Sequence, residues 1–262
     1  MRSLKENKMK KFKLTEEKKE YSEIVLYRIE ALCNFRDVSK GDLGGFVEKE
    51  ENLDHKGNAW IYDDALVYGN AWVFGNARVF GNARVSGNAR VSGNAEVFGN
   101  AWVYGNTRVF DKAKIYGNTW VYGNTRVFGN TWVYDNARVF NNARVSSNAR
   151  VYGDALVYDS AWVFGNAWVY NNARAYGGAR VSGSVSKTPI VLTGLKYSIV
   201  ITDNCLKIGC CFHTFEEWDS FTDDDIEELD DNYKDVILWK KHKKMLFNLI
   251  EAHTGYKTLE AG

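Results

Sequence analysis

A six-residue unit repeats almost without interruption between residues 59 and 186, and its commonest form reads Val-Tyr/Phe-Gly-Asn-Ala-Arg/Trp. An aliphatic residue or, once, an alanine falls at every sixth position from Ile61 to Val181, with no slip in register. A small residue, Ala or Thr, stands two positions before each of them. A fixed short period of this kind is typical of a solenoid, in which each repeat supplies one strand of a continuous coil.

Strand alternation explains why the unit holds these residue types. Successive side chains of a strand point to opposite sides, so Ala and Val share one side while Arg/Trp and Tyr/Phe share the other. A narrow triangular coil has room inside only for small and β-branched groups, which places Ala and Val inward. Gly and Asn tolerate the left-handed backbone of a sharp corner. The residues at every sixth position from Ile61 to Val181 number 21, and each belongs to one strand. With three strands per turn they form seven coils, stacked about 4.8 Å apart.

The flanking segments break the period and divide the chain into three regions. We expect an N-terminal cap over 1–58, the repeat domain over 59–186 and a C-terminal appendage over 187–262. The cap is predicted to hold short strands and a glycine-rich loop, Gly41–Val47, that leads into the repeat. Pro189 is expected to end the ladder of coil strands. Strands are then predicted over Ile190–Leu195 and Tyr197–Phe212, with a hairpin of Ile199–Thr202 and Cys205–Ile208, followed by helices.

Composition excludes few classes of protein. The net charge is +1, spread as a mildly basic middle (12 Lys+Arg against 7 Asp+Glu in 61–186) and an acidic end (9 against 14 in 187–262). This balance is too weak to indicate nucleic-acid binding by itself. The lysine-rich start has no apolar stretch of a signal peptide, no apolar run reaches membrane-helix length, and the four cysteines are not spaced as a disulfide framework. We therefore expect a soluble cytoplasmic protein.

The repeat resembles the hexapeptide-repeat left-handed β-helix, whose pattern is an aliphatic residue, any three, a small residue and any one. The flanking segments resemble the YdcK-like hexapeptide proteins of bacteria, prophages and phages: Gly41–Leu53 before the repeat, and Ile201–Asn204, Ile208–Cys210 and His213–Trp218 after it. Members of that family are often named transferases on the fold alone. The expected fold is mainly β: a left-handed parallel β-helix of about seven triangular coils, with a small N-terminal cap and an α/β C-terminal appendage.

Acyltransferases of this fold usually carry a histidine base in a coil or in a loop that protrudes from one. The histidines here are His55, His213, His242 and His253, all outside the coils, and no loop interrupts the register. We therefore predict that the protein is not an enzyme and needs no cofactor. The alternative is an acyltransferase with His55 or His213 as the base at a subunit junction.

Metal binding is not predicted. Cys205, Cys210, Cys211 and His213 lack the paired C-x-x-C spacing of zinc sites, and in a strand Cys210 and Cys211 would point to opposite faces. Buried structural cysteines are the simpler interpretation. The run Asp223–Asp225 is interpreted as a solvated helix start.

The outer faces of the coils carry the functional argument. Residues 18 apart stack in columns, and one column contains four consecutive arginines. A second face shows an unbroken aromatic column, and a third stacks two Trp-Val-Tyr units. The candidate binding residues are Arg90, Arg108, Arg126, Arg144, Trp102, Tyr104, Trp120, Tyr122, Trp132 and Tyr134.

Two interpretations of these columns stay open. Aromatic columns stabilise stacked strands through cross-strand pairs, and arginines stack on rings. Alternatively, apolar patches rich in Trp, Tyr and Arg mark interaction surfaces, and a row of arginines needs anions to neutralise it. We expect a non-enzymatic macromolecule-binding protein, with a protein partner, and the phage resemblance implies an inhibitor of a host defence complex of the anti-CRISPR type. Binding of a nucleic-acid backbone is the alternative.

Self-association is also expected. The acidic segment 216–235 is a candidate counter-charge for the arginines, supplied from a second subunit. A homo-oligomer formed through the C-terminal helices is the predicted arrangement.

Overall fold

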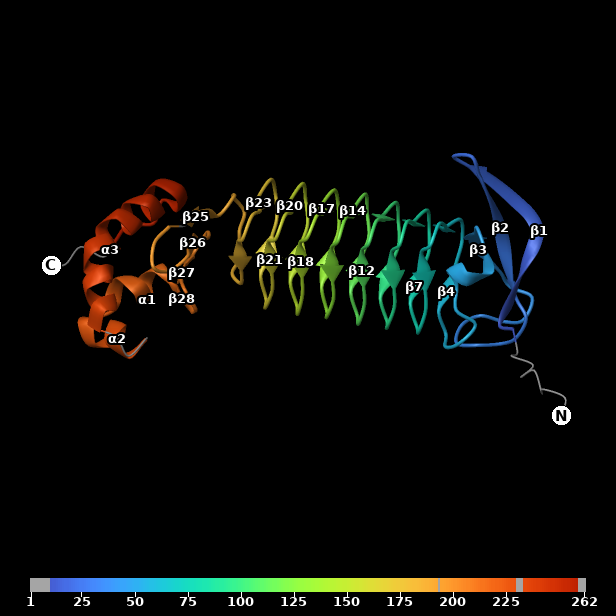
Figure 1. The fold of residues 1–262 in the computed structure, drawn as a ribbon, viewed down its shortest axis with the longest axis horizontal. Coiled ribbons are helices and arrows are strands. Elements are labelled where there is room, and N and C mark those ends of the chain that lie inside the picture. Colours follow the sequence, from blue (N-terminus) through green and yellow to red (C-terminus); the bar gives the residue numbers. More distant parts are fainter. Residues whose placement is uncertain (1–9, 193, 230–232, 259–262) are drawn as a thin grey trace.

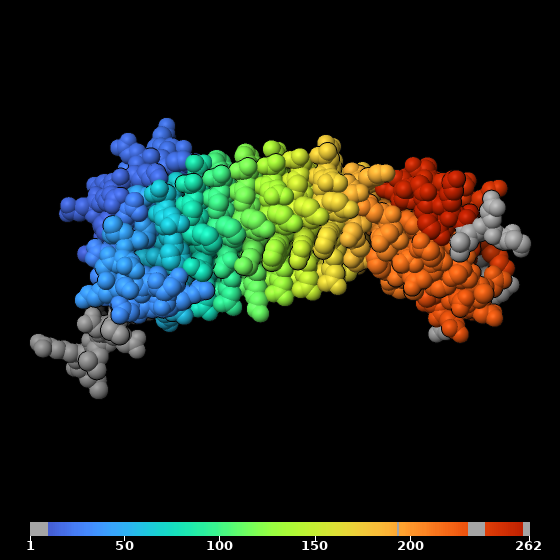
Figure 2. All heavy atoms as spheres, turned by 180° about the vertical axis from the view of Figure 1, so that it is seen from behind, coloured from blue at the N-terminus to red at the C-terminus, as the bar shows by residue number. Residues whose placement is uncertain are grey.

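The computed structural model describes residues 10–192, 194–229 and 233–258, without the side chains of 233–238. Figure 1 shows an elongated molecule: a β-hairpin at one end, a stack of coils in the middle and a small α/β unit at the other end. In the space-filling view the coils form parallel ridges that run across the molecule and follow one another along its long axis (Figure 2). The predicted parallel β-helix is confirmed.

Three parallel sheets form the sides of the coil, and each is named here by its first two-residue strand. The β4 face contains β4 (Trp60–Ile61), β7 (Arg78–Val79), β10 (Glu96–Val97), β13 (Lys114–Ile115), β16 (Trp132–Val133), β19 (Arg150–Val151) and β22 (Trp168–Val169). The β5 face contains β5 (Leu66–Val67), β8 (Arg84–Val85), β11 (Trp102–Val103), β14 (Trp120–Val121), β17 (Arg138–Val139), β20 (Leu156–Val157) and β23 (Arg174–Ala175). The β6 face contains β6 (Trp72–Val73), β9 (Arg90–Val91), β12 (Arg108–Val109), β15 (Arg126–Val127), β18 (Arg144–Val145), β21 (Trp162–Val163) and β24 (Arg180–Val181).

The interior of the coil follows the predicted alternation. The aliphatic residues at every sixth position, and the small residues two positions before them, are buried, and almost all of them have no exposed area. Each outward strand residue pairs with the residue 18 positions later, as Arg108 does with Arg126. The inward half of the repeat therefore forms the core, and the outward half forms continuous columns.

The coil has about eight turns, one more than the repeat predicts. Strand β3 (Leu43–Val47) lies antiparallel to β2 (Ile24–Ala31) but pairs parallel with β5, which places Val47 beside Val67. Leu53, just after the 3-10 helix η1 (Glu50–Asn52), bridges Val73. Together these segments form the first turn of the coil. The expectation that Gly41–Val47 is a loop was wrong, because Gly44 and Gly45 are in a strand.

The N-terminal cap closes this end of the coil. Strands β1 (Phe12–Tyr21) and β2 form an antiparallel hairpin, and Phe12 and Ile29 join the same buried cluster as Trp60. Lys11 is 4% exposed, and its Nζ donates to the carbonyl oxygen of Ala59 at 2.7 Å. Burial lowers the pKa of Lys11 from its usual 10.5 to about 8, although Asp54 acts in the opposite direction.

Lys11 should make the stability of the cap depend on pH. Its pKa is lower in the folded state than in the unfolded state, so the unfolded chain binds more protons between pH 8 and 10.5. We expect the free energy of unfolding to rise across that window, by about 2 kcal/mol relative to Lys11→Met after allowance for solvent screening. Urea unfolding of both proteins at several pH values measures the difference. Parallel pH profiles would contradict it.

The corners of the coil are held by side-chain amides as well as by backbone. Gly75 adopts a φ of +71°, the left-handed conformation that the sharp corner requires. The Asn that follows donates its amide to the Asn of the next coil, as Asn88 does to Asn106 at 3.0 Å. Where Asp replaces the corner glycine, as at Asp111, its carboxylate accepts from the backbone amide of Gly129 in the next coil at 3.2 Å. The polar corner residues thus have structural partners.

Four threonines replace alanine inside the coil, and one of them has an unsatisfied hydroxyl. Thr119 Oγ1 donates to the carbonyl oxygen of Tyr116, whereas the buried Oγ1 of Thr131 has no hydrogen-bond partner. Thr131→Val should therefore stabilise the fold by about 1 kcal/mol, because it removes an unpaired polar atom. Thr119→Val should destabilise it by about 1 kcal/mol. Denaturant midpoints of the matched pair test this, and equal shifts for both variants would contradict it.

The C-terminal unit packs a four-stranded antiparallel sheet against helices. The strands are β25 (Ile190–Leu192), β26 (Ile199–Ile201), β27 (Cys205–Ile208) and β28 (Cys211–Thr214), and the helices are α1 (Phe215–Ser220), α2 (Asp223–Glu228) and α3 (Tyr233–Thr254). Thr214 caps α1, because its side chain accepts from the amide of Glu217. The helices lie beyond the small sheet, at the end of the molecule and not along a coil face (Figure 1). Within the described residues, no helix combines the length and apolarity needed to cross a membrane.

Candidate functional site

The arginine column, defined as Arg90, Arg108, Arg126 and Arg144, runs straight down the β6 face. Strand pairing places each of these residues directly beside the next. All four side chains are exposed. At the strand spacing of about 4.8 Å, the column extends for roughly 14 Å. The structure therefore confirms the predicted stacking of these residues.

In the part of the chain that the structure describes, the column lacks counter-charges. Among the described residues, no carboxylate lies within ion-pairing distance of the four arginines, and none of the four stacks on a ring. The carboxylate of Asp111, at the corner of this face, is bonded to the backbone of Gly129. Two unit charges at this spacing repel by on the order of 1 kcal/mol in water. A bound anion would remove that repulsion.

Four of the five arginines on the other two faces have partners within the protein. The fifth, Arg174, lies beside Leu156 and is exposed, with no such partner among the described residues. On the β5 face, Arg84 lies over Trp102 at 4.6 Å and Arg138 over Trp120 at 5.2 Å, while the two indoles stack on each other at 5.3 Å. On the β4 face, Arg150 lies over the rings of both Trp132 and Trp168. These arginines stabilise the coil through cation–π contacts. The contrast singles out the arginine column.

Charges on the β4 face are balanced. Glu96 stands between Arg78 and Lys114 in the same column, with its carboxylate oxygens 3.9 and 3.1 Å from their nitrogens. Arg78 also pairs with Asp37 of the N-terminal cap at 3.0 Å. The β4 face is therefore not a second cationic strip.

The aromatic columns present ring edges and not ring faces. Tyr104 and Tyr122 are 4.9 Å apart with an angle of 2° between their planes, and Tyr116 and Tyr134 are similar at 5.0 Å and 4°. Because each ring covers the face of the next, the middle of a column has no free face on which a base or a sugar could stack. Burial raises the pKa of the Tyr104 and Tyr134 hydroxyls above the usual value for tyrosine. This geometry supports a structural role for the columns.

The ten predicted binding residues therefore do not form one site. The arginine column lies on the β6 face, while Trp102, Tyr104, Trp120 and Tyr122 line the β5 face. Trp132 and Tyr134 belong to the β4 face. Of the ten, only the four arginines combine exposure with the lack of a described protein partner.

The four histidines lie at the ends of the molecule. In the N-terminal cap, His55 Nδ1 accepts from the backbone amide of Lys11, and its Nε2 lies 2.6 Å from Glu50. In the C-terminal unit, His213 Nδ1 is 3.6 Å from Glu217, and its ring contacts Trp218 edge-on. Both rings are held by structural contacts, and both lie away from the coil faces.

The described part of the acidic segment 216–235 does not cover the arginine column within this chain. Its described part forms α1 and α2, where Asp223 pairs with Lys240 and Asp219 with Lys243. Residues 230–232 and the side chains of 233–235 lie outside the described part.

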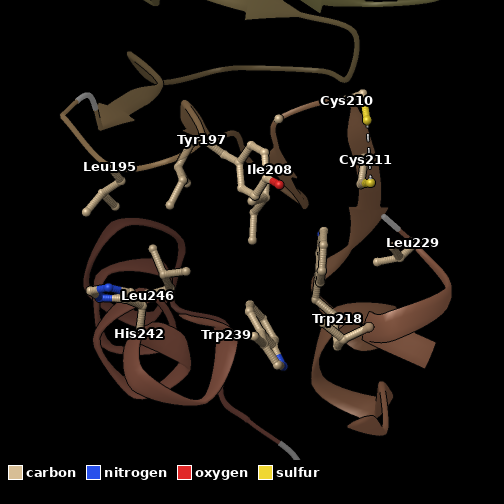
Figure 3. A pocket seen from close by; sticks show the side chains of 13 residues that line it. Leu195, Tyr197, Ile208, Cys210, Cys211, Trp218, Leu229, Trp239, His242 and Leu246 are labelled. Atoms are coloured by element: carbon tan, nitrogen blue, oxygen red, sulfur yellow. Dashed lines mark hydrogen bonds between the residues drawn. The ribbon is translucent and has the colours of Figure 1, made fainter. Parts of the chain in front are cut away.

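An apolar cavity of about 90 Å³ lies between the small sheet and α3 (Figure 3). Its walls include Tyr197, Trp218, Trp239, His242 and Leu246. Sequence reasoning missed this cavity because it depends on how α3 packs, which no local pattern encodes.

Two of the cavity residues correct an expectation. Cys210 and Cys211 do not point to opposite faces, because Gly209 and Cys210 form the turn between β27 and β28, and the two Sγ atoms are 3.8 Å apart. Cys210 is exposed and Cys205 is buried, so only the latter fits the prediction of buried cysteines. No group of three or more His, Cys, Asp or Glu side chains that could hold a metal ion occurs in the part of the chain that the structure describes.

Comparison with known proteins shows what the coils are similar to. The model of the YdcK β-solenoid repeat matches residues 59–75, 71–87, 77–93, 83–97, 89–105, 132–147 and 149–165. A protein of Escherichia coli (strain K12) named "Uncharacterized acetyltransferase YdcK" is 36% identical over 63 residues, which span 21% of this chain and 19% of that protein. The chain thus spans about a fifth of the length of this curated relative. Together with the coil geometry, these matches support a YdcK-like β-solenoid repeat in the coils, within residues 59–165.

Proposed function

We propose that this chain is a non-catalytic binding protein whose arginine column holds an extended polyanion. One observation carries the proposal: four exposed, in-register arginines have no carboxylate or ring partner among the described residues. A straight and evenly spaced row of cations matches a chain of regularly spaced anions better than the irregular surface of a folded protein. The phosphate backbone of a nucleic acid is such a chain.

The aromatic columns favour contacts to the backbone over recognition of bases. Base stacking needs an open ring face and accepts any base. The rings beside the arginine column, Phe110 and Phe128, cover one face of each other at 4.9 Å, so only their outer faces, toward Ser92 and Ser146, are left for a base. Binding should therefore depend little on sequence.

Titration of a labelled oligothymidine at several salt concentrations tests the proposal. Four phosphate contacts predict a slope of about −3 in a plot of log K against log salt for a single strand. Salt-insensitive binding, or no binding at low salt, would contradict it. Polyglutamate serves as the second probe: stronger binding to it than to DNA would favour an acidic protein as the partner, which is the first interpretation from the sequence.

A role as inhibitor of a host defence complex would be a narrower case of binding to a macromolecule, and it rests on the family resemblance alone. The test compares the partners that the native chain captures from host lysate with those captured by the charge-reversed variant Arg108→Glu with Arg126→Glu. A homo-oligomer formed through the C-terminal helices is likewise proposed, and light scattering of the purified protein tests it.

An acetyltransferase is the second candidate, because the E. coli relative bears that name. Two histidine–glutamate pairs are candidates for a catalytic base, His55 with Glu50 at 2.6 Å and His213 with Glu217 at 3.6 Å. Acetyl-CoA turnover that is lost in His213→Ala would support this candidate. The absence of CoA binding at millimolar concentration would exclude it.

A further inference from the structure

Two adjacent cysteines form the tip of a hairpin in the C-terminal unit. Strand β27 ends at Ile208 and β28 begins at Cys211, and these two residues pair across the turn. Gly209, with a φ of +59°, allows the chain to reverse within two residues. As a result both thiols lie on the same side of the turn, with their sulfur atoms 3.8 Å apart (Figure 3).

The two thiols differ in their access to solvent. The Cys210 side chain is exposed, whereas Cys211 is half-buried and lines the apolar cavity with Trp218 and Leu246. Neither is in a disulfide. Thiols that sense oxidants are typically accessible and lie next to a second thiol that can resolve the first oxidation product. This pair has both features.

A cation lies near the exposed thiol. Lys207, on β27, has a pKa lowered by burial and by Arg180, while the charge of Cys210 acts in the opposite direction.

We propose that Cys210 and Cys211 form a peroxide-reactive thiol pair, with Cys210 as the attacking residue and Cys211 as the resolving residue. The Cys210 thiolate attacks one oxygen of a hydroperoxide, the O–O bond breaks, and the leaving oxygen takes up a proton as water or an alcohol. Cys210 becomes a sulfenic acid. The Cys211 thiol then attacks that sulfur, water leaves, and a disulfide joins the two neighbours. One peroxide is reduced by two electrons, and two thiols are oxidised.

The product should be easily reduced. The Cα atoms of adjacent residues are about 3.8 Å apart, which is shorter than the usual span of a disulfide, about 4.4–6.8 Å. A strained disulfide is more readily reduced than a structural one. Oxidation of this pair should therefore be reversible by small thiols.

The other cysteines of the chain provide matched controls. Cys33 is exposed but has no adjacent cysteine. Cys205 is buried, and burial raises the pKa of its thiol to about 11. Neither should form an intramolecular disulfide.

Peroxide treatment of the full chain, followed by mass spectrometry of its peptides, tests the proposal. In the native protein we expect the peptide that contains Cys210 and Cys211 to lose two hydrogens at least about tenfold faster than the Cys33 peptide gains oxygen. Dithiothreitol should return the oxidised peptide to its original mass. In Cys211→Ser, Cys210 should instead accumulate as a sulfenic acid that dimedone traps. Cys33→Ser and Cys205→Ser should leave the reaction of the pair unchanged.

Three outcomes would overturn the proposal. Cys210 would react no faster than Cys33, or the native pair would pass directly to sulfinic acid, or the disulfide formed would join two chains. Because the native protein provides the main measurement, a folding defect in one variant would not affect the conclusion.

Discussion

Replacing two neighbouring members of the arginine column, by Arg108→Glu with Arg126→Glu, is expected to weaken binding of single-stranded DNA by at least about 100-fold at low salt. Two cations are lost, and the new carboxylates stand in register beside Arg90 and Arg144, the remaining members. The column then has no net charge. Fluorescence anisotropy with a labelled oligothymidine measures the affinity, and the salt dependence should almost disappear.

The matched control is Arg84→Glu with Arg138→Glu on the β5 face. It changes the net charge by the same amount, but these arginines lie over Trp102 and Trp120 and not in the arginine column. We expect at most a several-fold loss of affinity. If the control weakened binding as much as the first variant, the overall charge and not the column would attract the polyanion. Circular dichroism of both proteins establishes that the coil is intact.

The repeat made most of the coil predictable. A position that must fill a narrow interior accepts only Val, Ile, Ala or Thr, so the period of six residues survives in the sequence. The first turn was missed because the step from Leu53 to Ile61 is eight residues and not six. One signal was nevertheless present: Gly45 stands two positions before Val47, where the repeat requires a small residue.

The columns of the outer faces were predictable for the same reason, but their chemistry was not. Arg84 and Arg108 occupy equivalent positions in the repeat, yet only Arg84 lies over a ring, because its neighbour in the next coil is Trp102 and not another arginine. The distinction depends on the identity of residues 18 positions away, combined with the direction in which each side chain turns. The cysteine pair was mispredicted because a residue in a two-residue turn does not follow strand alternation.

The first turn should be the part of the fold most sensitive to a single methyl group. A Cβ atom on Gly45 would lie 2.5 Å from Cγ2 of Ile61 and 2.6 Å from the carbonyl oxygen of Ala65. Gly45→Ala should therefore push β3 away from β5 and destabilise the protein by about 3 kcal/mol. Amide exchange should accelerate in Phe46 and Glu48, whose N–H groups donate to Ala65 and Val67 in the next coil.

Gly178→Ala is the matched control for this prediction. Gly178 lies in the coils too, but a Cβ atom there would meet nothing within 4 Å, and its φ is not in the left-handed region. We expect its free energy of unfolding to stay within about 0.5 kcal/mol of the native value. Equal stability of the two variants would mean that β3 is not packed as a turn of the coil. A selective loss in Gly45→Ala would establish that the solenoid starts before its recognisable repeat, because only a strand enclosed by the next coil is so intolerant of a side chain.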